Sequence, residues 1–348
     1  MGQKLHAGIE KCRIIIANVL HCYPDQIIFN SGSSEGVSQI LFSVLEYAPQ
    51  DKKIIITSPI EHAVIPSALS FYQERRGFSI KYVDVDENGV INLPSLEKIL
   101  KEYKNQVALV TIMAANNETG VIQPYEQIAK ISHQYGAEYF ADTTQIIGKN
   151  HFDFEQSGMD YAVCAGHKVG ALTGTGFVIA KDATKLHPYV FGSHQEKGLR
   201  GGTQNYIGIE TLAVAFTDFA SSKNQLPNLE KARLHFEAEL KKDFPELVIL
   251  GAKAPRLPGT TMVSYPGIHS QAVQIELESH DIFVTTSAAC SDNQPDTSAV
   301  LKAMKIHDDV GRGVIRLSLS YHQGEHEYST ILTALRASYN KLRKIQSY

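Results

Sequence analysis

The stretch CAGHKVGALTGTG, residues 164–176, places a histidine and a lysine ahead of a glycine-rich run. A phosphate loop of the nucleotide hydrolases has its glycines first and ends in Gly-Lys-Ser/Thr at the start of a helix. Here Lys168 comes before the glycines, and the segment that follows them, FVIA, is typical of a strand. A nucleotide-binding loop is therefore disfavoured. Lys168 is then either a covalent catalyst or a charge beside a flexible loop.

Polar side chains also follow two other apolar runs. IIFNSGSSEG leads from a predicted strand through Ser33 and Ser34 into a predicted helix, and small residues at a helix N-terminus suit a phosphate. A serine N-cap alone would also account for that pattern. Asp142 ends the run EYFAD, with Gln145 three residues later. A carboxylate buried at a strand end needs a partner, which a protonated ring nitrogen, a lysine or the backbone could supply.

Two further segments carry side chains with more than one interpretation. Asn116 and Asn117 follow the run VALVTIM and are either hydrogen-bond donors or turn formers. His62, in SPIEHAV, could lie flat on an aromatic ring, although a lone histidine at a helix start is more often structural. A phosphate cradle, an acid for a ring nitrogen, a stacking imidazole and a lysine are together the parts of a pyridoxal-phosphate site.

A series of motifs makes this resemblance specific. In this order, SGSSE, EHAVI, NNETGVIQP, DTTQIIGK, GHK, GLRGGTQN, SAACS and IRLSLS resemble those of the cysteine desulfurases, in the class V branch of the fold-type I pyridoxal-phosphate enzymes. The similarity covers nearly the whole chain. It implies pyridoxal 5'-phosphate as the cofactor, conversion of L-cysteine to L-alanine, and a homodimer.

The resemblance also implies a role for each matching residue. Lys168 would bind the cofactor covalently and later move the Cα proton, His62 would stack on the ring and assist proton transfer, and Asp142 would pair with the ring N–H. The other implied contacts are the ring's hydroxyl side (Asn117 and Gln145), the phosphate (Ser33, Ser34 and His167), the neighbouring subunit's phosphate (Thr203), and the substrate (Asn117, and Arg316 for its carboxylate).

Cys290 would be the nucleophile that takes the sulfur. It lies in TTSAACSDNQPDTS, a polar stretch typical of a mobile loop. The resemblance implies that it carries a persulfide to a sulfur-acceptor protein, a scaffold or relay in iron–sulfur cluster assembly or tRNA thiolation. Two alternatives stay open: a selenocysteine lyase or other class V lyase, and a non-catalytic paralogue that only binds partners.

The sequence departs from the family pattern at several points. The usual opening motif D-x-A-A-T-T-P is not found, and the chain begins within the helix that follows it, as though an N-terminal segment were missing. Ala165 stands where the family has a serine before GHK, and Leu172-Thr173 replaces Pro-Lys after the lysine. We therefore expect reduced efficiency, with the lysine, aspartate, histidine and cysteine retained.

Alternating strands and helices would position these residues. Seven apolar runs predict strands, namely QIIFN, KIIIT, SIKYVDV, VALVTIM, EYFAD, YAVCA and GFVIA, and amphipathic stretches lie between several of them. This α/β pattern predicts a doubly wound, mostly parallel seven-stranded sheet, with ligands beyond the carboxyl ends of its strands. We expect a large cofactor-binding domain over residues 1–224 and a smaller α+β domain with the cysteine loop over 225–348.

Composition narrows the classes of partner. The formal net charge of −4 provides no general basic surface, so direct nucleic-acid binding is not expected. No run of residues predicts a signal peptide or a membrane span. The four cysteines (Cys12, Cys22, Cys164 and Cys290) form no C-x-x-C pair, which disfavours a zinc ribbon or disulfide framework. We expect no bound metal and a reducing cytoplasm, with Cys12 and Cys22 on helical faces and Cys164 in a strand.

Overall fold

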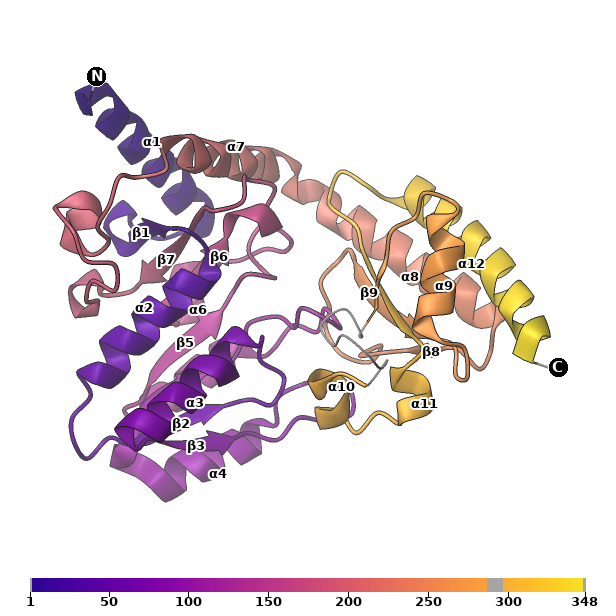
Figure 1. The fold of residues 1–348 in the computed structure, drawn as a ribbon, viewed down its shortest axis with the longest axis horizontal. Helices are drawn as coiled ribbons and strands as arrows, with labels where there is room; N and C mark the ends of the chain where they lie inside the picture. The colour runs from indigo at the N-terminus through magenta and orange to yellow at the C-terminus, as the bar shows by residue number, and fades with distance from the viewer. Residues whose placement is uncertain (1, 287–296, 347–348) are drawn as a thin grey trace. The chain divides into compact units, whose positions relative to one another are not determined.

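The structure is a computed structural model that describes residues 2–286 and 297–346 (Figure 1). The chain divides into two compact units. The first comprises Met1–Asp84, Ile91–Ala115 and Gln123–Ser221, and the second comprises Val85–Val90, Asn116–Ile122 and Ser222–Tyr348. We expected a boundary after residue 224; the division falls after Ser221 instead. Two short segments from the first half of the chain, Asn116–Ile122 among them, also belong to the second unit.

A seven-stranded sheet forms the centre of the first unit. Each predicted apolar run contains one of its strands: β1 (Ile27–Asn30), β2 (Ile54–Thr57), β3 (Ser79–Tyr82), β4 (Val107–Thr111), β5 (Glu138–Asp142), β6 (Tyr161–Ala165) and β7 (Gly176–Ala180). Their order is β1-β7-β6-β5-β4-β2-β3, and only β7 runs antiparallel to its neighbours. The predicted fold class is therefore confirmed.

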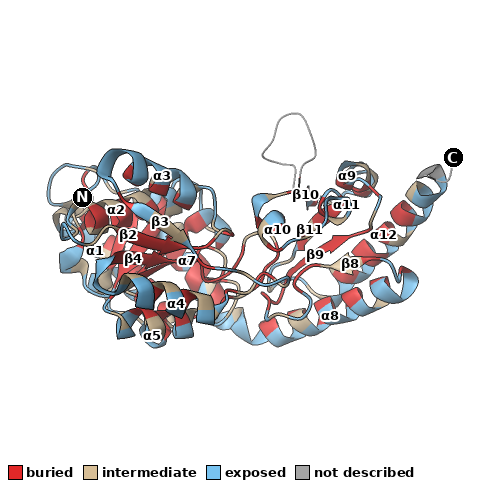
Figure 2. Cartoon of the chain, turned by 90° about the horizontal axis from the view of Figure 1, so that it is seen from below, coloured by how far each residue is buried: buried red, intermediate tan, exposed pale blue. Residues whose placement is uncertain are grey.

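Helices cover both faces of this sheet. Neighbouring residues of a strand point to opposite faces, and β7 shows what each face meets. Val178 lies against Gly36 of α2 (Ser33–Glu46), whereas the ring of Phe177 contacts that of Phe216 on α7 (Tyr206–Ser222), with centroids 5.8 Å apart. Figure 2 shows β2 and β4 as buried strands flanked by helices with exposed outer faces. Helices on both faces explain why most strands are apolar throughout rather than alternating.

The remaining helices of the first unit follow the predicted periodicity. Those between strands are α3 (Val64–Arg76), α4 (Leu93–Tyr103), α5 (Tyr125–Gln134) and the short α6 (Phe154–Ser157), and α1 (Gly2–Leu20) precedes the first strand. One apolar cluster, under α2 and α3, includes Leu41, Leu69, Leu109 and Phe140, all fully buried. Burial of such side chains stabilises each by roughly 1.5–3 kcal/mol relative to exposure.

The second unit is a smaller α+β structure, as expected. Its four-stranded antiparallel sheet has the order β10-β11-β9-β8, formed by β8 (Val248–Ile249), β9 (Thr260–Ser264), β10 (Thr285–Thr286) and β11 (Val314–Ser318). Its helices are α8 (Leu226–Asp243), α9 (Ser270–Glu278), α10 (Ala299–Ala303), α11 (Asp308–Gly311) and α12 (Glu325–Gln346). Side chains from α8, α9 and α12 pack on β9 and β11 in one core that includes Phe236, Val263, Leu277, Ile315 and Leu335. Within the described ranges, no helix is both long and apolar enough to cross a membrane.

Candidate functional site

One edge of the large sheet gathers most of the predicted site residues of the first unit. Ser33 follows β1, His62 follows β2, Asp142 ends β5 and Lys168 follows β6. These four strands run parallel, so their carboxyl ends lie at the same edge of the sheet. In open α/β sheets that edge is where ligands bind. The topology therefore brings together side chains that lie up to 135 residues apart in sequence.

The N-terminus of α2 forms a cradle for an anion at this edge. Gly32 is its N-cap, and the first bond within the helix runs from the N–H of Gly36 to the carbonyl of Gly32, at 3.1 Å. The N–H groups of Ser33, Ser34 and Glu35 thus precede the helical hydrogen-bond pattern, as anion-binding N–H groups do. Ser33 is half-buried and Ser34 exposed.

Gly176, the first residue of β7, lets this strand approach the cradle closely. It pairs with both Asn30 of β1 and Ala165 of β6. A Cβ atom at this position would lie 2.4 Å from the carbonyl oxygen of Cys164 and 2.6 Å from the Cα of Gly32. Only glycine fits this contact without a shift of the backbone. Gly176 thus acts in sheet pairing, while Gly170 and Gly174, with φ angles of 97° and 73°, lie in the turn before β7. A strand rather than a helix follows these glycines, which does not suit a nucleotide loop.

Asp142 is a buried carboxyl with an open oxygen. Its Oδ1 accepts a hydrogen bond from the N–H of Thr144 at 2.9 Å, and among the described residues Oδ2 has no recorded donor. The buried Oγ1 of Thr144 also lacks a partner there. A buried carboxylate with an open lone pair is costly unless a cation or donor meets it. The residue therefore fits a protonated ring nitrogen, which is what a pyridine-type cofactor would bring.

Lys168 is the last residue of a short 3-10 helix, Gly166–Lys168, that begins directly after β6. Its side chain and that of His167 are exposed. Burial first, and then the charges of Lys168 and Lys149, lower the pKa of His167. His167 is therefore neutral near pH 7 and can both donate and accept a hydrogen bond. The 3-10 helix fixes the backbone of Lys168, and its exposed amine is accessible to solvent or ligand.

The turn between β2 and α3 carries His62, which is exposed. Its Nδ1 accepts a hydrogen bond from the N–H of Val64 at 3.3 Å, so its recorded contact is local. Gln145 is also placed by a neighbour, because its Oε1 accepts a hydrogen bond from the amine of Lys149. Sequence reasoning missed Lys149; the spacing of four residues was the only signal for this contact.

The second unit holds the predicted substrate-binding pair. Arg316, on β11, donates from Nη1 to the carbonyl of Asn117 and from Nη2 to Oγ1 of Thr285, the latter at 3.2 Å. Burial lowers the pKa of Arg316, while the charge of Glu118 opposes the shift. The buried Oδ1 of Asn117 has no partner among the described residues. Glu118, which sequence reasoning missed, accepts a hydrogen bond from Ser298 at 2.6 Å.

Thr203 and Cys290 are the two remaining predicted site residues. Thr203 is exposed on a segment that follows the 3-10 helix Gln195–Gly198 of the first unit. Next to it, Gln204 donates to the buried carboxylate of Glu196, which ties the segment to the rest of the unit. Cys290 lies outside the described residues.

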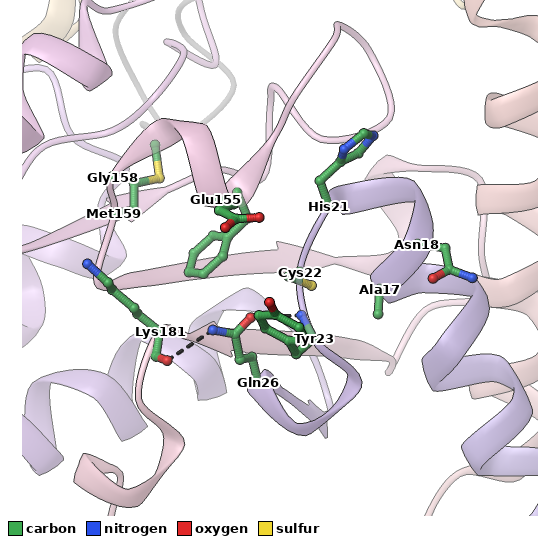
Figure 3. Close-up of a pocket in the computed structure, with 11 residues that line it drawn as sticks. Ala17, Asn18, His21, Cys22, Tyr23, Gln26, Glu155, Gly158, Met159 and Lys181 are labelled. Atoms are coloured by element: carbon green, nitrogen blue, oxygen red, sulfur yellow. Dashed lines mark hydrogen bonds between the residues drawn. The ribbon is translucent and has the colours of Figure 1, made fainter.

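A separate cavity of about 390 Å³ lies in the first unit, and none of the predicted site residues lines it (Figure 3). It is lined by residues that include His21, Cys22, Glu155 and Lys181. We expected Cys22 on a helical face; it instead follows the end of α1 and is half-buried. Burial, with the charge of Asp153 adding, raises the pKa of Cys22 to about 12. The thiol is therefore a poor nucleophile. Cys12 and Cys164 are buried, and Cys164 lies in β6 as expected.

No group of three or more histidine, cysteine, aspartate or glutamate side chains is arranged to hold a metal within the residues that the structure describes.

The family model for class-V aminotransferases matches residues 1–329. The chain is 31% identical over 350 residues to a cysteine desulfurase of Enterobacter agglomerans, covering 100% of this chain and 86% of that protein.

Two solved structures are similar as well. One is a NifS-like protein, with a TM-score of 0.89 and 33% identity over 98% of this chain and 90% of that one. The other is described as SspA in complex with cysteine, with a TM-score of 0.76 and 26% identity over 91% of this chain and 88% of that one.

Proposed function

The chain belongs to the class-V aminotransferase family and, within it, to the cysteine desulfurases, and we propose that it takes sulfur from L-cysteine, releases L-alanine and leaves the sulfur on Cys290. The single observation that carries the proposal is the shared sheet edge, where Asp142 ends one parallel strand and Ser33 and Lys168 follow two others. The similarity to a protein determined in complex with cysteine supports the choice of substrate.

The residues at this edge fit pyridoxal 5'-phosphate. In the proposal, Asp142 accepts the ring N–H and His62 lies on the ring face. The remaining proposed contacts are the phosphate (Ser33, Ser34 and His167) and the ring's hydroxyl side (Gln145 and, from the second unit, Asn117). When bound, the cofactor supplies an electron sink that stabilises negative charge on the substrate carbons next to its amino group. The open oxygen of Asp142 and the free N–H groups of α2 support these assignments.

The chain's own residues would then bind, orient and move protons. The Lys168 amine holds the cofactor covalently and, once released, moves the proton at the substrate Cα. The planar guanidinium of Arg316 binds the substrate carboxylate with two parallel hydrogen bonds. Its two donor groups already point to oxygen atoms in this structure, those of Asn117 and Thr285. These contacts hold the fork in place before the substrate arrives.

Cys290 would carry out the sulfur transfer as a thiolate. Its Sγ attacks the substrate sulfur, so an S–S bond forms while the substrate Cβ–S bond breaks. The electron pair of the broken bond stays with the substrate, and Cβ takes up a proton to become the methyl group of alanine. Cys290 keeps the sulfur as a persulfide. We propose a protein acceptor for it, a scaffold or relay of iron–sulfur assembly or tRNA thiolation. The three described cysteines are free thiols, which supports a reducing cytoplasm as the compartment.

A homodimer is the proposed assembly. Ile207 and Val214 are 67% and 68% exposed, and their spacing of seven residues places them on one face of α7. Phe191, on the segment before Thr203, is 77% exposed, and Leu172, close after Lys168, is 52% exposed. An exposed apolar pair on one helix face supports a protein interface there. In the dimer, Thr203 would reach the phosphate held by the partner subunit.

Absorption and turnover test the proposal together. Protein purified with pyridoxal 5'-phosphate should show a near-visible band that is lost in Lys168→Ala and kept in Lys181→Ala, a lysine of the separate cavity. It should also form alanine from cysteine, and Cys290→Ser should abolish that activity while keeping the band. A wild-type protein without the band would refute the proposal. Unchanged turnover in Cys290→Ser would instead assign a lyase reaction that needs no protein thiol.

A further inference from the structure

Glu61, next to His62, joins two strand ends of the large sheet. It lies in the turn after β2, and its Oε1 accepts hydrogen bonds from the hydroxyl of Ser58 at 2.5 Å and from the N–H of Met113 at 3.0 Å. Ser58 follows β2 and Met113 follows β4, and both are almost fully buried, at 2% and 1% exposed. The last paired residues of these two strands are Thr57 and Thr111. Glu61 therefore continues the connection between the strands beyond the end of their ladder.

The same stretch of β4 leads directly to Asp142. The N–H of Ala114, one residue after Met113, donates to the carbonyl of Asp142 at 3.0 Å. The N–H that donates to Glu61 and the N–H that donates to Asp142 therefore belong to consecutive residues, Met113 and Ala114. The turn with His62 and the strand end with Asp142 are fixed to the same short segment. A shift at Glu61 would be transmitted to both.

A glutamate is a costly choice for a turn of this kind. Burial raises the pKa of Glu61 to about 8, and the charge of Asp142 adds to the shift. Both recorded hydrogen bonds end on Oε1, so Oε2 is the oxygen left to hold the proton. A glutamine has the same shape and presents an oxygen and an N–H₂ group in the same places. Substitution of Glu61 by glutamine therefore separates a role in hydrogen bonding from a role for the charge.

We propose that Glu61 is a positioning residue for the desulfurase reaction. By accepting hydrogen bonds from Ser58 and Met113, it fixes the turn that carries His62 to the end of β4. That strand end is in turn bonded to Asp142. The inference rests on the proposed function, because it assigns the positions of His62 and Asp142 to cofactor binding. Glu61 acts through its neighbours and has no recorded contact of its own with a reacting group.

Four variants test this role: Glu61→Ala removes the acceptor, Glu61→Gln keeps it, Ser58→Ala removes one donor, and Glu74→Ala is a control on the exposed face of α3. In protein prepared without cofactor, hydrogen exchange of a peptide that contains Met113 should be roughly tenfold faster in Glu61→Ala and unchanged in Glu61→Gln. In cofactor-loaded protein, the visible circular dichroism spectrum should change in Glu61→Ala and stay like wild type in Glu61→Gln. Its kcat should fall about tenfold with KM for cysteine within about threefold of wild type.

The outcomes separate this inference from the proposed function. Ser58→Ala should show a smaller loss of the same kind, and it keeps the test informative where Glu61→Ala does not fold. Wild-type exchange and full kcat in both Glu61→Ala and Ser58→Ala would overturn the positioning role, as would equal damage by Glu61→Gln and Glu61→Ala. If the wild type forms no alanine, the function has failed, and the exchange measurement alone still decides whether Glu61 clamps the two strand ends.

Discussion

Arg13 and Glu196, 183 residues apart in the chain, form a buried two-pronged ion pair with N–O distances of 2.8 and 2.9 Å. Glu196 also accepts a hydrogen bond from the N–H of Phe29 on β1, at 2.8 Å. The pair holds a backbone that is otherwise unfavourable, because Glu196 and Lys197 have φ angles of 48° and 56°. The segment that it secures leads to Thr203. The ion pair thus connects the first helix, the first strand and the proposed dimer contact.

Removal of one member of this pair should be strongly destabilising. Arg13→Ala leaves the buried carboxylate of Glu196 without its counter-charge, which costs about 3–5 kcal/mol for pairs of this kind. Urea denaturation measures the loss. The matched control is Lys197→Ala. Lys197 is next to Glu196 in the chain, but its ion pair with Asp25 lies on the exposed surface. Its free energy of unfolding should change by less than about 1 kcal/mol. Equal losses in both variants would contradict the importance of the buried pair.

The contribution of Glu61 to the stability of the wild type should fall as pH rises toward 8. The pKa of Glu61 is raised to about 8 in the folded protein, above the value near 4.3 of an unfolded glutamate. The folded chain therefore keeps a proton that the unfolded chain releases between these values. The resulting stabilisation is complete below about pH 4.3 and is lost as pH rises through about 8.

Comparison with Glu61→Gln isolates this contribution. The difference in free energy of unfolding between wild type and variant should shift in the variant's favour from about pH 5 to about pH 8, by at most about 1.4 kcal/mol per pH unit. Thermal unfolding followed at several pH values gives the difference directly. A constant difference over that range would show that Glu61 titrates alike in the folded and unfolded chains.

Gly176→Ala should weaken both the fold and cofactor binding. The added methyl group would lie 2.4 Å from a backbone oxygen and 2.6 Å from Gly32 at the start of the anion cradle. Overpacking of this kind costs about 1–3 kcal/mol. Gly324→Ala is the control, since nothing lies within 4 Å of its added atom. Chemical denaturation and titration with pyridoxal 5'-phosphate report the two effects. Wild-type affinity in Gly176→Ala would show that the cradle tolerates the displacement.

Arg316→Lys should raise the KM for cysteine about tenfold, because lysine keeps the charge but loses the planar fork. A smaller effect on kcat is expected, since the substrate carboxylate does not change during the reaction. Arg312→Lys, at an exposed arginine of the same unit, should leave both constants unchanged. Steady-state assays of alanine formation measure them. An unchanged KM in Arg316→Lys would place the carboxylate elsewhere.

The sequence predicted the sheet well because its strands are short apolar runs separated by clear helical patterns. Each run, such as VALVTIM or EYFAD, contains one observed strand. The positions of Asp142 and Lys168 at strand ends followed from the same reading. Their shared edge required the order of the strands, which periodicity does not contain.

The contacts that support the site were not predictable in this way. Glu61 accepts from Met113, 52 residues later, and Glu118 accepts from Ser298, 180 residues later. No local pattern marks a partner at such distances. The assignment of Asn116–Ile122 to the second unit has the same origin, because Val121 forms a bridge with Arg256 and the N–H of Ile122 donates to Pro255.

The pairing of β1 has a consequence for how the protein is made. β1 is an edge strand whose partner in the described sheet is β7, with Ile27 opposite Ile179. During synthesis, residues 27–30 therefore have no strand to join until residue 180 has left the ribosome. The anion cradle directly after β1 can form only then. Folding that proceeds with chain growth would complete the proposed cofactor-binding edge late, after most of the first unit has been synthesised.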